Sequence, residues 1–178
     1  MARHVTTTLS TLLLATALAA LSPEPGQRTV APAHAGTYAF KLAGASVPLA
    51  IPDSWQVSGI KNGIQVTRPD QEVFVWLQTA TQDSIGPLMD EYKSYFAKQG
   101  VTFSGVPKSE EHDLGSATAL DIRFDAKWKG SPTVVVLSVV TRKANPAGTV
   151  LIGYWASPKA DKESDPQMGQ LLGSLIAP

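Results

Sequence analysis

Residues 120–155 read LDIRFDAKWKGSPTVVVLSVVTRKANPAGTVLIGYW, and this stretch decides the fold. Its first part alternates apolar and charged side chains, which is the period-2 pattern of a strand with one face in water. Turn-forming residues at 129–132 and 145–148 divide the stretch into three segments. The later segments are rich in β-branched residues, which disfavour a helix. We therefore predict a meander of three antiparallel strands.

The residues before this meander predict further strands. Alternating side chains indicate strands over 37–42 and 47–51, and Asn62-Gly63 is typical of a tight hairpin turn between two more. The segment 73–77 is apolar at every position, so we place that strand in the middle of the sheet. A short strand is also expected over 101–106.

Two amphipathic helices complete the predicted fold. The first has Asp83 or Ser84 as its N-cap and ends at Gly100. The second opens with Asp165 as N-cap and Pro166 at its first helical position. Because strands and helices do not alternate as β-α-β units, we predict an α+β fold. It consists of an antiparallel β-sheet of about six to seven strands, sandwiched with the two amphipathic helices.

The first 35 residues predict an export signal peptide. A basic start with Arg3, an apolar run over 9–21 and the tripeptide Ala-His-Ala at 33–35 are the three features of such a signal. We expect cleavage after Ala35, with Ala19 as the alternative. An uncleaved membrane anchor is disfavoured, because the apolar run is shorter than a bilayer-spanning helix of about 20 residues.

Cleavage after Ala35 leaves residues 36–178, which we expect to form a single α+β domain that is periplasmic or secreted. The chain contains no cysteine, so disulfides, thiolate nucleophiles and a lipid-modified cysteine anchor are excluded. The 15 basic and 15 acidic residues are interleaved, which argues against a nucleic-acid partner. No stable membrane insertion is expected after the signal is removed.

The chemical motifs of common enzymes are missing from the sequence. It has no Gly-x-Ser-x-Gly elbow, no His-Glu-x-x-His and no phosphate-binding glycine loop. Of the three histidines, only His112 remains after cleavage at Ala35. We therefore predict neither an enzyme nor a bound cofactor or metal.

Two charged segments are candidate sites. Residues 109–113 contain three carboxylates and His112, which suit cation binding or proton transfer, but we interpret this segment as a solvated loop. Asp121 and Asp125 flank Arg123 on one face of a predicted strand. They form either a pair of catalytic carboxylates or a surface ladder of ion pairs, and we favour the ladder.

The tryptophans are a third candidate, because aromatic side chains are common in pockets for apolar or sugar ligands. We predict core positions for Trp76 and Trp128. Trp155 lies beside Tyr154 near the end of its strand, where an exposed indole would anchor a partner.

Two phrases and the order of elements resemble the PsbP-like family, which includes the extrinsic protein of photosystem II and a Ran-binding nuclear import factor. VPLAIPDSW at 47–55 resembles the family's early apolar strand followed by Pro-x-x-Trp. LSVVTRK at 137–143 resembles its late strand, which runs into a Thr-Arg loop. The resemblance implies an antiparallel sheet between helices and a non-enzymatic role in docking to larger assemblies.

These observations lead to one main hypothesis and two alternatives. The main hypothesis is an exported non-catalytic domain that binds a protein partner in the cell envelope. The alternatives are a periplasmic carrier of a small apolar or aromatic ligand, and a hydrolase or isomerase that uses His112 with nearby carboxylates. The candidate contact residues are Trp155, Tyr154, His112, Asp121, Arg123 and Asp125.

Overall fold

The computed structural model describes residues 36–177. The predicted signal peptide and both cleavage positions fall in residues 1–35, outside the described residues. None of the helices in the described part is long and apolar enough to cross a bilayer. In chain order the elements are β1 (Gly36–Leu42), β2 (Ala45–Ile51), β3 (Gln56–Ile60), β4 (Gly63–Thr67), β5 (Val73–Ala80), α1 (Gln82–Lys98), β6 (Val101–Asp113), β7 (Ala117–Trp128), β8 (Ser131–Arg142), β9 (Asn145–Ala156) and α2 (Pro158–Ile176).

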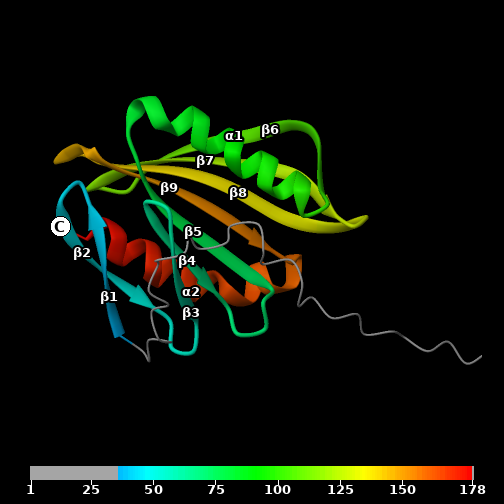
Figure 1. The fold of residues 1–178 in the computed structure, drawn as a ribbon, viewed down its shortest axis with the longest axis horizontal. Coiled ribbons are helices and arrows are strands. Elements are labelled where there is room, and N and C mark those ends of the chain that lie inside the picture. The colour runs from blue at the N-terminus through cyan, green and yellow to red at the C-terminus, as the bar shows by residue number, and fades with distance from the viewer. Residues whose placement is uncertain (1–35, 178) are drawn as a thin grey trace, which may run out of the picture.

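A seven-stranded antiparallel sheet forms the centre of the molecule (Figure 1), as the sequence predicts. Its strand order is β3-β4-β5-β9-β8-β7-β6, and β1 and β2 form a separate hairpin. The predicted meander is present as β7, β8 and β9. The last strand, β9, pairs with β5 on its other side and so joins the N-terminal and C-terminal halves of the sheet.

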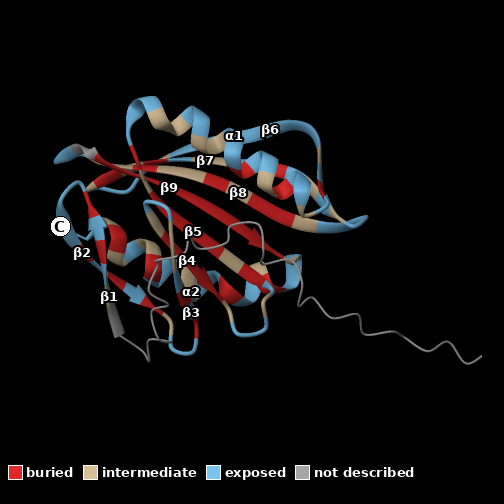
Figure 2. Cartoon of the chain, viewed as in Figure 1, coloured by how far each residue is buried: buried red, intermediate tan, exposed pale blue. Residues whose placement is uncertain are grey.

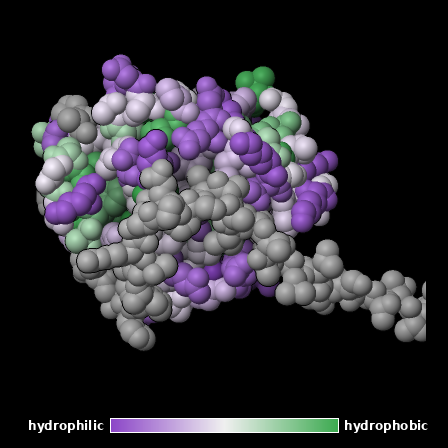
Figure 3. Space-filling view, viewed as in Figure 1, coloured by the Kyte–Doolittle hydropathy of each residue, from purple (hydrophilic) through white to green (hydrophobic). Residues whose placement is uncertain are grey.

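The sheet is covered on both faces and therefore has two cores (Figure 2). On one face, α2 and the β1–β2 hairpin bury mainly aliphatic side chains, including Val66, Val75 and Ile152. On the other face, α1 buries a cluster of aromatic side chains. On the outside, hydrophilic residues are spread over the visible face with apolar residues between them (Figure 3).

The aromatic core is organised around Trp76 on β5, which is fully buried. Its ring meets those of Tyr92 and Phe96 on α1 edge-on, with centroids 6.0 and 5.8 Å away. Aromatic pairs favour this geometry. The indole Nε1 donates a hydrogen bond of 2.9 Å to Gln65 Oε1 on β4, so the polar atom of this ring is satisfied inside the core. These contacts fix α1 on the sheet.

Gly153 allows α1 to approach the sheet closely. It lies on β9, opposite Trp76 on β5, and faces the Tyr92 ring. A Cβ atom at residue 153 would lie 2.7 Å from Tyr92 Cε1, closer than real Cβ contacts. The missing side chain at this position therefore makes room for the aromatic core.

The helix starts differ from the prediction. For α1 the N-cap is Thr81, whose capping box with Ser84 begins the helix slightly earlier than expected. The predicted start of α2 at Asp165 is wrong, since this helix begins at Pro158 and Pro166 lies inside it. The Ser157 hydroxyl accepts a hydrogen bond of 3.2 Å from the backbone N–H of Ala160, which makes Ser157 the N-cap.

The predicted loop at 109–113 is also wrong. These residues belong to the edge strand β6, in which Glu110 pairs with Asp121 and His112 with Ala119. The register shifts between Ser104 and Lys108, which marks a β-bulge. The segment lacks an apolar alternation because its side chains are mostly exposed, so the usual sequence signal of a strand is absent.

We expect Gly153→Ala to lower the free energy of unfolding by about 1–3 kcal/mol, because the new methyl group would overpack the Tyr92 ring. As a control, Gly169→Ala on the exposed face of α2 meets nothing within 4 Å and should raise stability by about 0.5–1 kcal/mol. Urea unfolding measures both changes. If both substitutions changed the free energy of unfolding equally, the packing of the Tyr92 ring would not require glycine at residue 153.

Candidate functional site

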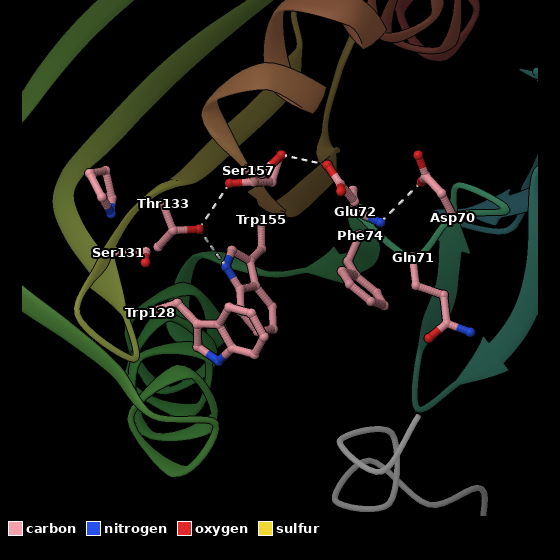
Figure 4. A pocket seen from close by; sticks show the side chains of 11 residues that line it. Asp70, Gln71, Glu72, Phe74, Trp128, Ser131, Thr133, Trp155 and Ser157 are labelled. Atoms are coloured by element: carbon pink, nitrogen blue, oxygen red, sulfur yellow. Dashed lines mark hydrogen bonds between the residues drawn. The ribbon is translucent and has the colours of Figure 1, made fainter. Parts of the chain in front are cut away.

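A cavity of about 370 Å³ opens at one end of the sheet, where β7 and β9 end and β5 and β8 begin (Figure 4). Three aromatic side chains, Phe74, Trp128 and Trp155, form its apolar wall, and we call it the aromatic pocket. The polar lining comes from the segment before β5, from the first residues of β8 and from the residue that follows β9. The remaining lining residues are Asp70, Gln71, Glu72, Ser131, Pro132, Thr133, Ala156 and Ser157.

The rings of the aromatic pocket hold one another in place. Phe74 stacks on Trp155 with ring centroids 5.6 Å apart, and Trp128 meets Trp155 edge-on at 5.8 Å. The Trp155 Nε1–H donates a hydrogen bond of 2.9 Å to Thr133 Oγ1, and Trp128 Nε1–H donates one of 2.9 Å to the Gln99 carbonyl. Both indoles are thus fixed by a ring contact and a hydrogen bond.

Trp155 is not the exposed indole that the sequence predicts, because only 8% of its surface is exposed. One side of the residue belongs to the aromatic core, where Phe96 meets its ring edge-on at 5.9 Å. The residue nevertheless lines the aromatic pocket. Trp128, predicted in the core, is half-buried and lines the same pocket.

Acidic side chains line the side of the pocket that leads into β5. The Glu72 carboxylate accepts a hydrogen bond of 2.7 Å from the Ser157 hydroxyl at the N-terminus of α2. Asp70 accepts hydrogen bonds of 2.8 and 2.9 Å from Arg68 Nε, and this guanidinium holds the pKa of Asp70 below its ordinary value. Arg68 also donates a hydrogen bond of 3.0 Å to the hydroxyl of Ser164 on α2. This network ties the pocket wall to α2.

A second, smaller cavity of about 150 Å³ lies on the opposite face of the sheet, and we call it the α2 groove. Its wall combines apolar side chains of the sheet and of α2 with the carboxylates of Asp121, Asp161 and Asp165. Tyr154 lies beside Asp161, and burial is the main cause of the raised pKa of its hydroxyl.

Several of the sequence-predicted site residues meet at the α2 groove. His112 Nε2 lies 3.4 Å from Asp121 Oδ2, and Arg123 Nη2 lies 3.6 Å from Asp161 Oδ2 on α2. Asp125 lies further along β7, where it pairs with Ser104 on β6 and Val134 on β8. The predicted ladder of ion pairs is therefore wrong in its partners: among residues 36–177, Arg123 pairs with Asp161, and neither Asp121 nor Asp125 pairs with Arg123.

Tyr154 and Trp155 are separated because adjacent residues of a strand face opposite sides of the sheet. Tyr154 belongs to the core beneath α2, and Trp155 belongs to the core beneath α1. Among residues 36–177, no three side chains of the metal-ligating types gather to hold an ion. For the hydrolase hypothesis, the carboxylate that contacts His112 is Asp121.

Sequence reasoning missed two important pocket residues. Phe74 lies in the predicted central strand, but nothing in the sequence marks it as a site residue, although it shares one strand face with Trp76, for which a core position is predicted. Glu72 follows a turn and carries no sequence signal of its own, because its position depends on pairing between strands far apart in the chain.

Comparison with known proteins gives a fold but no family. No family model matches the chain, and no curated protein matches its sequence. CyanoP, the cyanobacterial PsbP from Synechocystis sp. PCC 6803, superposes with a TM-score of 0.52 and 9% sequence identity, over 84% of this chain and 97% of that chain. The fold is PsbP-like.

Two other solved structures are similar to this chain at lower TM-scores. PA94 of Pseudomonas aeruginosa, a protein of unknown function, has a TM-score of 0.38 at 13% identity, over 82% of this chain and 99% of its own. The Ran-binding protein Mog1p of Saccharomyces cerevisiae has a TM-score of 0.41 at 10% identity, over 81% of this chain and 100% of its own. At these identities the similarity concerns the fold alone.

Asp70→Asn is expected to lower the free energy of unfolding at pH 7 by about 0.5 kcal/mol, a small value because 47% of the Asp70 side chain is exposed. The folded-state pKa of Asp70 is lowered, so its ionised form contributes stability above the ordinary value of about 4. That contribution is lost as the pH falls through the folded-state pKa.

Urea unfolding of Asp70→Asn and of the unmodified protein at several pH values below 7 measures this effect. The difference between them should begin to shrink below about pH 4, where the carboxyl group of the unfolded chain is protonated, and should disappear once the pH is below the lowered pKa of the folded state. Asp125→Asn serves as the control, because Asp125 forms no ion pair among the described residues. A difference that does not change with pH would contradict the assigned Arg68–Asp70 interaction.

Proposed function

We propose that this chain is an exported, non-catalytic domain that binds a protein partner in the cell envelope through the aromatic pocket. The observation that carries the proposal is the fixed group of Phe74, Trp128 and Trp155 at the open end of the sheet. Large aromatic side chains in surface pockets are the usual anchors of protein interfaces. Because these rings are already held in position, binding would cost little conformational entropy.

A small-ligand carrier is the second candidate function. It is favoured by the size of the pocket, about 370 Å³, which falls within the common range of small-molecule sites, roughly 300 to 1,000 Å³. A carrier, however, surrounds most of its ligand, whereas this pocket lies between surface turns at a sheet end. Its position therefore supports a partner that covers the pocket from outside.

The proposed location rests on the N-terminal sequence. A basic start, an apolar run over 9–21 and the Ala-His-Ala tripeptide at 33–35 together support export. The absence of cysteine means that the domain needs no disulfide to fold in an oxidising compartment.

We expect the protein purified from the cell envelope to begin at Gly36, because the processing enzyme recognises the small residues at 33 and 35. N-terminal sequencing of the purified protein measures this directly. A chain that begins at Ala20 would still support export, with the alternative cleavage site. A chain that keeps Met1 and fractionates with the cytoplasm would contradict the proposed location.

Photo-crosslinking tests the proposed docking surface. A benzoylphenylalanine at Gln71, on the pocket wall, should give one discrete protein adduct in intact cells. The same group at Lys61, in the turn between β3 and β4 at the other end of the sheet, is the control and should not. Adding Phe74→Ala should reduce the Gln71 adduct at least about fivefold, since the stacked wall is lost. Equal adducts from Gln71 and Lys61 would contradict docking at the pocket.

A further inference from the structure

We infer that the aromatic pocket receives an arginine side chain of the protein partner. This inference rests on the proposed function and adds the chemistry of the group that enters the pocket. Three features of the described residues support it. The pocket wall presents the surfaces of aromatic rings, the N–H groups of its indoles donate to acceptors within the protein, and the charge of Glu72 is unpaired.

The N–H donors of the aromatic wall are used inside the protein. Trp155 donates to Thr133 Oγ1, and the Thr133 hydroxyl in turn donates a hydrogen bond of 2.9 Å to the carbonyl of Ala156. Trp128 donates to the backbone carbonyl of Gln99. The indoles therefore present ring surface to the pocket and not N–H groups (Figure 4). An occupant that needs indole donors, such as an anion, would find none.

Glu72 is the carboxylate of this site that has no cationic partner. Within residues 36–177, its side chain forms no ion pair and accepts a hydrogen bond from the Ser157 hydroxyl. The nearby Arg68 is already engaged by Asp70 and by Glu163 on α2. The pocket thus combines aromatic surface with one negative charge that a partner can neutralise.

A guanidinium group meets both requirements. It is planar, stacks on aromatic rings, and presents several N–H donors that match a carboxylate. It is also more weakly hydrated than an ammonium group, so entering a half-apolar pocket costs less. Lys129 Nζ lies 4.6 Å from the centre of the Trp128 ring and already makes a cation–π contact with it, so the guanidinium shares this wall with one ammonium group.

Other occupants fit less well. A purely aliphatic side chain would cover Glu72 without pairing its charge, which carries a desolvation cost. An acidic side chain would be repelled by the unpaired charge of Glu72. The charge of Glu72 is therefore the property of the pocket that favours an arginine side chain over a neutral one.

Glu72→Gln is the variant that isolates this charge. A glutamine at residue 72 keeps a carbonyl oxygen that can accept the hydrogen bond from Ser157, so the pocket wall should keep its shape. The backbone contact between the Ser157 N–H and the residue 72 carbonyl, at 3.3 Å, is unaffected. Glu110→Gln on the edge strand β6 is the matched control, because it removes the same charge far from the pocket.

The experiment titrates three short peptides into the protein purified from the cells that make it. The peptides are acetyl-Gly-Arg-Gly-amide, its citrulline equivalent and its leucine equivalent. Citrulline keeps the shape of arginine but has no charge. The indole N–H signals of Trp128 and Trp155 are followed by two-dimensional NMR at low ionic strength, where charge pairing is least screened.

The arginine peptide should shift both indole signals saturably and bind about tenfold more tightly than the citrulline and leucine peptides. Glu72→Gln should remove this preference, and Glu110→Gln should leave it unchanged. The inference is overturned if the arginine peptide binds no better than the citrulline or leucine peptide, if Glu72→Gln keeps the preference, or if no peptide shifts the signals. Because the Gln71 adduct forms whatever side chain enters the pocket, docking can hold while the arginine assignment fails.

Discussion

The contact between Trp76 and the aromatic residues of α1 is the interaction on which the rest of the structure depends. It joins β5 to α1, and the missing side chain at Gly153 lets Tyr92 lie directly against the central strand β9. Since β9 pairs with both β5 and β8, this one packing arrangement aligns the two halves of the sheet. Its largest contribution is apolar burial, and the hydrogen bond from Trp76 to Gln65 satisfies the indole donor of Trp76.

The aromatic pocket is the open end of that same core. Phe74 stacks on Trp76 at 5.9 Å and on Trp155 at 5.6 Å, so the rings continue from the buried centre to the surface. The wall of the aromatic pocket is held in place, because each ring is packed against another ring. The α2 groove differs in kind: its carboxylates meet Arg123 and His112 at 3.6 and 3.4 Å, as a loose surface network beside apolar side chains.

The sequence predicts an antiparallel sheet of about six to seven strands, the meander and both helices, because these elements carry apolar periodicity, β-branched segments or turn residues. It fails where that pattern is absent or ambiguous. The edge strand over 109–113 is exposed, so nothing marks it as a strand, and the polar first turns of α2 conceal its start at Pro158. The site is predicted only in part for a similar reason. The sequence indicates Trp155 as a candidate residue, but local patterns do not predict its burial or its position beside Phe74 and Glu72. Both depend on pairing between strands that are far apart in the chain.

Hydrogen–deuterium exchange of the protein alone and bound to the protein captured by the Gln71 crosslink tests the central claim most directly, since it compares the two faces of one sheet in a single measurement. If the open end of the aromatic core is the docking surface, protection on binding should be concentrated in residues 70–74, 129–133 and 155–157. Protection confined to 121–123 and 161–172, with exchange around the aromatic pocket unchanged, would place the partner on the α2 groove and contradict the claim.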